Sequence, residues 1–135
     1  MLKVSRFTLI ELIIVIAIIA IIGAILIPSF LNTTDRARLR SDVQSARVLQ
    51  NAMELYITEQ GQPAGANIAD VKARLDATGY VDSNRIRVQT NGAAFILYQD
   101  RVRLDLTGPQ VPANVSGTLA GQLSPQELAY VRTSP

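Results

Sequence analysis

The hydrophobic pattern divides the chain into an apolar N-terminal part and a mixed remainder. From Leu12 to Ile27 every residue is apolar, and across 7–31 the single ionisable side chain is Glu11. A helix of that length extends about 37 Å, which exceeds the roughly 30 Å hydrocarbon core of a bilayer. A soluble domain of this size has no interior for a helix that is apolar on all sides. The pattern therefore predicts a transmembrane or filament-core helix over 7–31.

Beyond residue 31 the apolar residues recur at helical spacing. The stripe consists of Leu39, Val43, Ala46, Leu49, Met53 and Tyr56. Spacings of three and four place these residues on one helix face, so 32–60 is predicted as an amphipathic continuation of the same helix. Gly61, Pro63 and Gly65 mark its end.

Basic residues cluster just after the apolar run. The cluster is made of Arg36, Arg38, Arg40 and Arg47. We expect a solvated, subunit-facing surface with Asp35 and Asp42 as local partners, and contact with anionic headgroups or DNA remains an alternative. Specific nucleic-acid binders show a denser basic footprint, so no specific nucleic-acid partner is predicted.

Residues 61–135 are predicted to form a small globular domain. Asn67 caps a short helix through Ala77, and Ser124-Pro125-Gln126-Glu127 is a capping box that begins another. Three strands are expected at 85–89, 94–98 and 102–106 as an antiparallel meander, with 94–98 in the centre because it is apolar on both faces. Asn91-Gly92 is the expected hairpin turn, Asp100-Arg101 turns the chain again, and the Gly, Pro, Asn and Ser-rich stretch 110–123 reads as an exposed loop.

These elements define the fold class as α+β. A long N-terminal helix carries a small antiparallel β-sheet domain packed on its C-terminal half. The domain is too small for a large core of its own and is expected to lean on the helix.

The composition lacks the residue types on which most catalytic sites depend. The chain of 135 residues has 13 Lys and Arg, 11 Asp and Glu, no His and no Cys. Disulfides, iron–sulfur centres and thiolate zinc sites are excluded, and the usual general base is absent. We predict no enzyme activity, no catalytic residues, no cofactor and no metal; Asp82-Ser83-Asn84 fits a polar turn better than a calcium loop.

Glu11 is the exception within the apolar run. A carboxylate inside a membrane costs about 2.5–3.5 kcal/mol on insertion scales. One interpretation places Glu11 near the headgroups, where the positive end of the helix dipole favours it. The other interpretation is that a neighbouring subunit supplies a cation that pairs with Glu11.

The N-terminal residues resemble a known family. The block Phe7-Thr8-Leu9-Ile10-Glu11-Leu12, the aliphatic run after it and Pro28 are similar to the N-terminus of type IV pilins and type II secretion pseudopilins. The resemblance covers about the first 60 residues and includes a class III leader signal, here residues 1–6. It implies that a prepilin peptidase cuts between Arg6 and Phe7 and methylates the new Phe7 amine, and that Glu11 neutralises the amine of a neighbouring subunit.

One position departs from the family pattern. Arg6 stands where the family has Gly immediately before the Phe. If the chain is cut, Phe7 is the mature N-terminus. If it is not, Arg6 or Lys3 of a neighbour is the expected cation opposite Glu11.

Gly23 and Pro28 weaken the predicted helix between them. Glycine costs about 1 kcal/mol and proline about 3 kcal/mol in a helix interior. A simple kink is one outcome. The resemblance implies another, in which residues 20–28 lose helical hydrogen bonds on assembly and make the filament extensible.

The resemblance implies a structural subunit that polymerises through its N-terminal helix. Lys3 and Arg6 predict a cytoplasmic N-terminus before assembly into an extracellular filament. The implied partners are the membrane, copies of the chain, the peptidase and an inner-membrane assembly platform with an extension ATPase. Alternatives are a pseudopilin of a type II secretion or DNA-uptake machine and a signal-anchored periplasmic binding module that never polymerises. Major pseudopilins often carry a calcium-binding loop near the C-terminus, and residues 128–135 contain no acid, so the resemblance favours the pilus over the pseudopilin.

Overall fold

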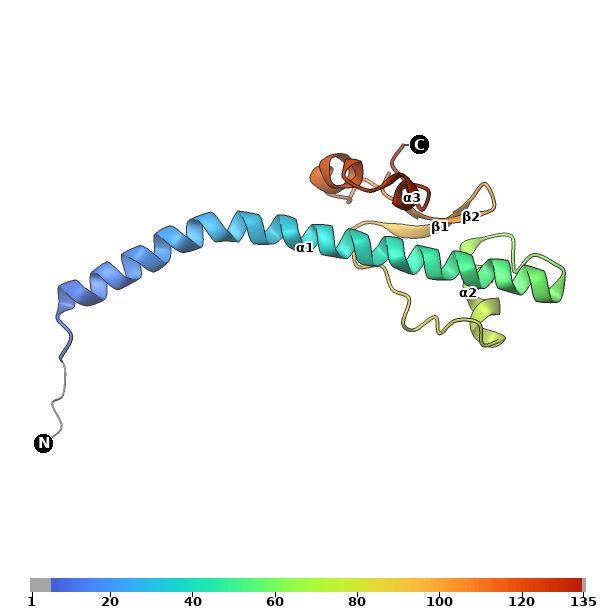
Figure 1. Cartoon of the computed structure of the whole chain (residues 1–135), viewed down its shortest axis with the longest axis horizontal. Helices are drawn as coiled ribbons and strands as arrows, with labels where there is room; N and C mark the ends of the chain where they lie inside the picture. Colours follow the sequence, from blue (N-terminus) through green and yellow to red (C-terminus); the bar gives the residue numbers. More distant parts are fainter. Residues whose placement is uncertain (1–5, 135) are drawn as a thin grey trace, which may run out of the picture. The chain divides into compact units, whose positions relative to one another are not determined.

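The computed structural model describes residues 6–134 and divides the chain into two units, Met1–Thr34 and Asp35–Pro135. The fold is α+β, as predicted, with one long helix and a small three-stranded sheet (Figure 1). The elements are α1 (Leu9–Gln60), α2 (Ile68–Ala77), β1 (Ala94–Tyr98), β2 (Arg101–Asp105), the π-helix η1 (Val115–Leu119), α3 (Pro125–Leu128) and β3 (Val131–Arg132).

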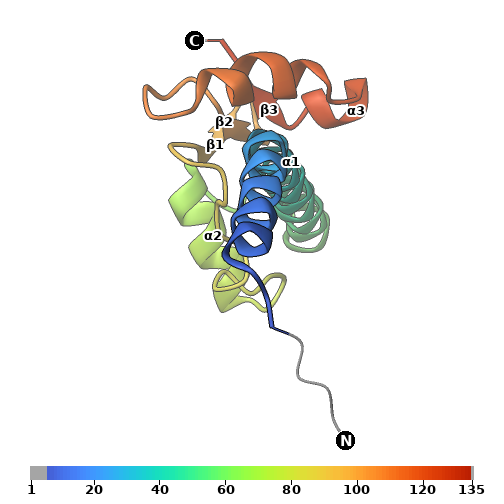
Figure 2. The same ribbon diagram turned by 90° about the vertical axis from the view of Figure 1, so that its left-hand side faces the viewer.

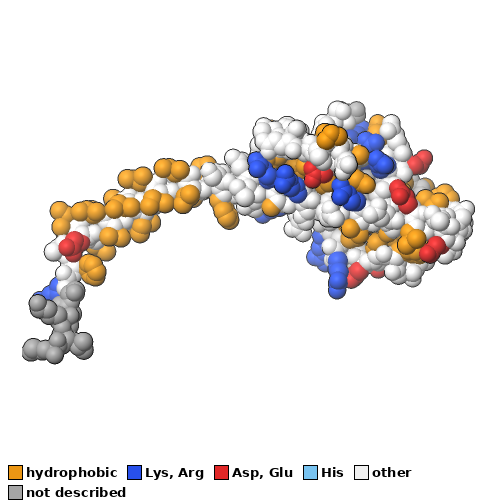
Figure 3. All heavy atoms as spheres, viewed as in Figure 1, with side chains coloured by type: hydrophobic (Ala, Val, Ile, Leu, Met, Phe, Trp, Pro, Cys, Tyr) orange, Lys and Arg blue, Asp and Glu red, His pale blue; other side chains and the backbone are white. Residues whose placement is uncertain are grey.

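The first unit contains the apolar part of α1. Its large side chains are exposed, with Leu9 at 76% and Ile25 at 68% (Figure 3). By length and composition α1 is apolar enough to cross a membrane, and none of that stretch is buried. The helix predicted from residue 7 begins at Leu9.

The second unit is built on the remainder of α1. All six residues of the predicted apolar stripe are buried in its core. Gly61 ends α1 in a left-handed conformation with φ 70°, and its N–H donates to the Ile57 carbonyl at 2.8 Å. Figures 1 and 2 show α2 on one side of this part of α1 and the sheet on another.

The sheet differs from the predicted meander. The strand order is β1-β2-β3, so β2 is central and β1, predicted to be central, lies at an edge. β1 and β2 form an antiparallel hairpin, whereas β3 pairs with β2 in parallel through Leu104 and Val131. The hairpin loop is Gln99-Asp100, with φ 53° and 57°. Asn91-Gly92 forms a turn, but it does not join paired strands.

Residues 85–89 are irregular, so the strand predicted there is wrong. Asp42 of α1 is fully buried and accepts the Gln89 N–H at 2.8 Å and the Thr90 N–H at 2.7 Å. The Lys72 ammonium donates to the Ile86 carbonyl at 3.4 Å. Side chains therefore satisfy the backbone N–H and carbonyl groups that would have paired with a neighbouring strand in the predicted sheet.

The segment predicted as the exposed loop 110–123 contains η1. Four apolar side chains within it are buried, namely Val115, Leu119, Ala120 and Leu123. Asn114 also donates through Nδ2 to Asp35 Oδ2 at 3.3 Å. Composition alone suggested a solvated loop, but these side chains give the segment enough apolar surface to pack.

Both predicted helix caps are confirmed. The Asn67 side chain accepts the Asp70 N–H at 3.0 Å at the start of α2. At α3, Ser124 and Glu127 exchange reciprocal hydrogen bonds. The Ser124 N–H bound to the carboxylate is the main cause that lowers the pKa of Glu127 below its usual value.

Candidate functional site

The start of α1 brings together two residues of the N-terminal block. The Thr8 N–H donates to Glu11 Oε2 at 3.1 Å, and the Glu11 N–H donates to Thr8 Oγ1 at 3.2 Å. This reciprocal pair is a capping box, with Thr8 at the N-cap and Glu11 at the third helical position. It satisfies two of the backbone donors that the first turn of a helix leaves without intrahelical partners.

The capping box fixes where the carboxylate of Glu11 lies. At the third helical position it sits at the positive end of the helix dipole, which favours a negative charge. Phe7 is 84% exposed, and it borders a shallow hollow along the helix with Leu12, Ile14 and Val15. The arrangement presents one acid within an otherwise apolar surface.

This geometry bears on the two interpretations of Glu11. A local hydrogen bond together with the dipole offsets part of the cost of placing a carboxylate in an apolar helix. The cap leaves Glu11 Oε1 without a hydrogen bond inside residues 6–134. One oxygen thus acts within its own helix and the other is open to a donor. A cation from a neighbouring subunit stays a prediction.

Sequence reasoning missed the role of Thr8. The signal was present, because Thr8 and Glu11 have the T-x-x-E spacing of a capping box directly before an apolar run. The aliphatic surroundings of Glu11 indicate the cost of burying its charge, but they do not indicate that Thr8 is its hydrogen-bond partner. Arg6, the residue before the predicted cut, is exposed and precedes the first helical residue by three positions.

Gly23 and Pro28 both lie inside an unbroken α1. A Cβ added at Gly23 meets nothing within 4 Å. Pro28 has no N–H, so the carbonyl four residues earlier lacks its helical donor. After Pro28 the Thr33 and Thr34 hydroxyls donate to the Ser29 and Phe30 carbonyls, each at 2.9 Å. Loss of helical structure on assembly stays a prediction.

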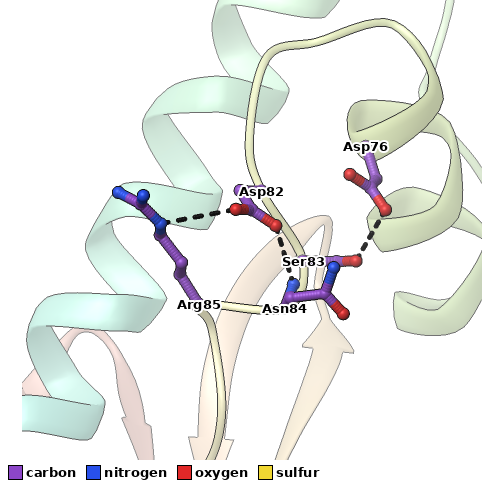
Figure 4. Close-up of polar contacts among 5 residues, drawn as sticks. All are labelled: Asp76, Asp82, Ser83, Asn84 and Arg85. Atoms are coloured by element: carbon purple, nitrogen blue, oxygen red, sulfur yellow. Dashed lines mark hydrogen bonds and ion pairs between the residues drawn. The ribbon is translucent and has the colours of Figure 1, made fainter.

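The polar stretch at 82–85 forms a turn (Figure 4). Asp82 accepts the Asn84 N–H through Oδ1 at 3.1 Å and pairs through Oδ2 with Arg85 Nε at 3.4 Å. Ser83 donates to Asp76 Oδ2 at 2.7 Å. The polar-turn interpretation is confirmed. Across residues 6–134, no group of three or more acidic, His or Cys side chains is placed to hold a metal ion.

The expected acidic partners of the arginine cluster are engaged elsewhere. Asp42 binds the backbone of Gln89 and Thr90, and Asp35 binds Asn114. The ion pair present within the described chain is the one between Arg85 and Asp82. The prediction that Asp35 and Asp42 are local ion-pair partners of the arginines is therefore wrong: fully buried Asp42 satisfies backbone donors that share its burial, and half-buried Asp35 accepts from Asn114.

Comparison with known proteins gives one informative relative. The chain is 35% identical over 83 residues to a fimbrial protein of Neisseria meningitidis serogroup A / serotype 4A (strain DSM 15465 / Z2491), and the match includes 60% of this chain. It includes 49% of the fimbrial protein, so the chain spans about half the length of the curated relative it matches. No family model matches, and no solved structure matches. The similarity supports the pilin-like character indicated by the N-terminal block.

Proposed function

We propose that the chain is a structural subunit of a type IV pilus-like filament that polymerises through its N-terminal helix. The observation that carries this proposal is an exposed apolar helix whose start holds one capped acid, Glu11. Similarity to a fimbrial protein supports the same role. Before assembly residues 7–31 span the cytoplasmic membrane, and afterwards they pack in the filament core.

The remaining parts have proposed roles that follow from this one. Residues 1–6 are the leader, 32–60 extend the helix, and 61–135 form the outer domain. A subunit-to-subunit contact that does not close on itself propagates as a fibre. Each buried methylene of the Ile, Leu and Val side chains contributes about 0.8 kcal/mol to that contact.

Glu11 is the proposed assembly residue. Its free carboxylate oxygen forms an ion pair with a cationic group of a neighbouring subunit. In a processed chain this group is the methylated amine of Phe7, and in an unprocessed chain it is Arg6 or Lys3. An unprocessed filament keeps residues 1–6 in every subunit. Intact-mass measurement of filament subunits separates these two versions. A subunit that retains residues 1–6 has no free amine at Phe7, which excludes the version with the methylated amine.

A Glu11→Ala variant tests the proposal. We expect loss of surface filaments containing the chain, measured by electron microscopy of shed material, because the apolar helix then lacks a charge partner for its neighbour. Normal fibres from this variant would refute the assembly role.

Thr8→Ala is the matched control. It removes the hydroxyl that accepts the Glu11 N–H but keeps the carboxylate. The lost cap weakens the first helical turn by about 1 kcal/mol. We expect filaments to persist in this variant. If both variants lose them equally, Glu11 acts through helix capping and not through a neighbour.

Shed filaments also separate the pilus from the pseudopilus. Long fibres containing the chain support the proposal. Absence of fibres together with a secretion defect on deletion indicates a pseudopilin of a secretion machine.

A further inference from the structure

Three exposed arginines follow the apolar run, and within residues 6–134 none of them is paired with a carboxylate. Arg36, Arg38 and Arg40 are solvent-exposed on α1. The two acids nearest in sequence form no ion pair with them: Asp42 accepts two backbone N–H groups, and Asp35 accepts the Asn114 amide through one oxygen. Guanidinium groups without such partners keep their donors available for an external anion.

Arg40 acts electrostatically on Glu127 of the domain. The Ser124 N–H hydrogen bond, and to a smaller extent the charges of Arg40 and Arg47, lower the pKa of Glu127. The carboxylate of Glu127 is nevertheless committed to the capping box of α3. A carboxylate that accepts hydrogen bonds from neutral amides keeps its charge, so the four arginines at 36, 38, 40 and 47 exceed the acids Asp35, Asp42 and Glu127 by one positive charge.

The placement of these arginines along α1 suits a membrane surface. They follow Leu31 by five to nine residues of continuous helix. At the helical rise the backbone of Arg36 lies about 8 Å beyond Leu31 and that of Arg40 about 14 Å, whereas the headgroup layer is roughly 5–8 Å thick. Arg36 is therefore at the outer edge of this layer, and Arg38 and Arg40 reach it through side chains that tilt toward the helix N-terminus. Arginine stems reach several ångströms along apolar surface while their heads stay in the polar layer.

Their angular distribution around α1 also indicates a surface and not a groove. Arg36 and Arg40 are separated by about 40° around the helix axis, whereas Arg38 lies about 200° from Arg36. The buried stripe that begins at Leu39 falls between these two directions. Basic side chains on both flanks of the helix, about 6 Å apart along its axis from first to last, can extend toward one layer of phosphates.

We propose that Arg36, Arg38 and Arg40 bind the phosphate groups of anionic phospholipids while the subunit is held in the membrane. Guanidinium groups donate paired hydrogen bonds to phosphate oxygens. This inference rests on the proposed membrane-stored subunit and adds a lipid class to it. Assembly then requires these arginines to exchange lipid phosphates for the filament environment.

The test measures which lipids stay with the full-length chain. The protein is extracted in mild detergent with equal amounts of phosphatidylglycerol and phosphatidylcholine, washed, and its retained lipids are quantified by mass spectrometry. We expect enrichment of phosphatidylglycerol. A basic residue near an anionic surface is worth roughly a fivefold change in binding, so R36Q/R38Q/R40Q should lower the enrichment by up to about a hundredfold.

Two further variants control for charge and folding. R74Q/R101Q/R132Q removes the same number of charges from α2, β2 and β3 and should retain wild-type enrichment. R36K/R38K/R40K keeps the charges and should retain most of it. Loss of enrichment in the R74Q/R101Q/R132Q control, or its retention in R36Q/R38Q/R40Q, overturns the proposal.

The outcome is separable from that of filament assembly. Lipid enrichment is measured on the detergent-extracted chain whether or not filaments form. A failed Glu11 test leaves the lipid result standing, and an unchanged lipid ratio leaves assembly standing. If R36Q/R38Q/R40Q alters the oligomeric state in detergent while the lipid ratio stays constant, the arginines contact a second copy of the chain and the lipid proposal is wrong.

Discussion

Two polar side chains of α1 hold the domain to the helix. Asp42 accepts two backbone N–H groups from the segment after α2. Gln50 accepts the Val102 N–H of β2 at 2.8 Å and donates to Glu54 at 2.8 Å. Both are buried within the apolar face. Each supplies the partner that a buried backbone donor needs, so at this scale the domain depends on polar contacts as well as apolar packing.

Asp42→Asn should lower the free energy of unfolding by about 1–3 kcal/mol. The amide keeps one accepting oxygen but turns an N–H group toward a backbone donor, leaving that donor unsatisfied in the interior. Urea unfolding of the detergent-held chain, followed by circular dichroism, measures the change. Asp82→Asn, at an exposed turn, should change the stability by less than about 0.5 kcal/mol. Equal effects at both positions would contradict the anchoring role of Asp42.

Glu127 should make the domain less stable in acid. Its pKa is lowered in the folded chain, chiefly by the Ser124 N–H hydrogen bond, so its contribution is present above the unfolded pKa and is lost as pH falls through the folded pKa. Glu127→Gln should therefore be less stable than wild type near neutral pH. The difference should shrink as the pH falls through the lowered pKa of Glu127, where the folded carboxylate becomes protonated. A difference that stays constant from neutral pH down to about pH 3 would rule out the charged cap.

At the scale of elements, α1 is one helix stabilised in two ways. Residues 35–60 bury a stripe against the domain, which is how most helices in water are stabilised. Residues 9–34 have no such partner within their unit, and their β-branched side chains are poor helix formers in water. Under the proposed function, lipid or neighbouring copies would supply the environment in which backbone hydrogen bonds keep that part helical.

Gly23→Ala tests the weakness of the segment before Pro28. The added methyl enters open space, so helix propensity alone acts and favours the helix by about 1 kcal/mol. If residues 20–28 lose helical structure on assembly, the variant should form stiffer filaments that extend less under force in optical-trap measurements.

Ala24→Gly is the opposite change at the next residue and should give more extensible filaments. Identical extension of wild type and both variants would refute melting of this segment.

At the scale of the whole molecule, the distribution of apolar surface differs sharply between the two units. The second unit encloses a continuous core, while the first exposes its aliphatic side chains along α1 (Figure 3). Contiguous exposed apolar surface of this extent marks a membrane or protein interface. The chain therefore requires a second apolar phase, which the proposed function identifies as lipid first and other copies later.

The full chain should associate when detergent is removed. Sedimentation velocity should show large assemblies, because water then replaces the apolar phase around α1. Ile18→Asp with Ile22→Asp, two side chains about half exposed, should reduce association strongly. Val48→Asp with Leu55→Asp, at similar exposure in the second unit, should leave it intact. A dispersed wild-type chain would contradict a filament subunit.

Local patterns predicted the helices because their signals lie within a few residues. The aliphatic run, the stripe from Leu39 to Tyr56 and the Asn67 cap each contain their own evidence. The hairpin of β1 and β2 was predicted in outline, but its loop was placed one residue late and β1 in the wrong position of the sheet. Strand order depends on which segment returns to β2, and no local pattern specifies that β3 does so.

The sequence by itself determined the α+β class, the apolar helix with its one acid, and the absence of thiol and imidazole chemistry. These follow from residue type and short spacing, which act over a few turns of chain. Only the tertiary structure decided that Asp42 binds the backbone of residues 89 and 90 and that the segment 110–123 contains η1 and packs on the core. It also decided that, among the described residues 6–134, Arg36 and its neighbours form no ion pair. These contacts join residues that are far apart in the chain. Several donors could bind each acceptor as far as the sequence pattern shows, and burial in the folded domain decides which of them does.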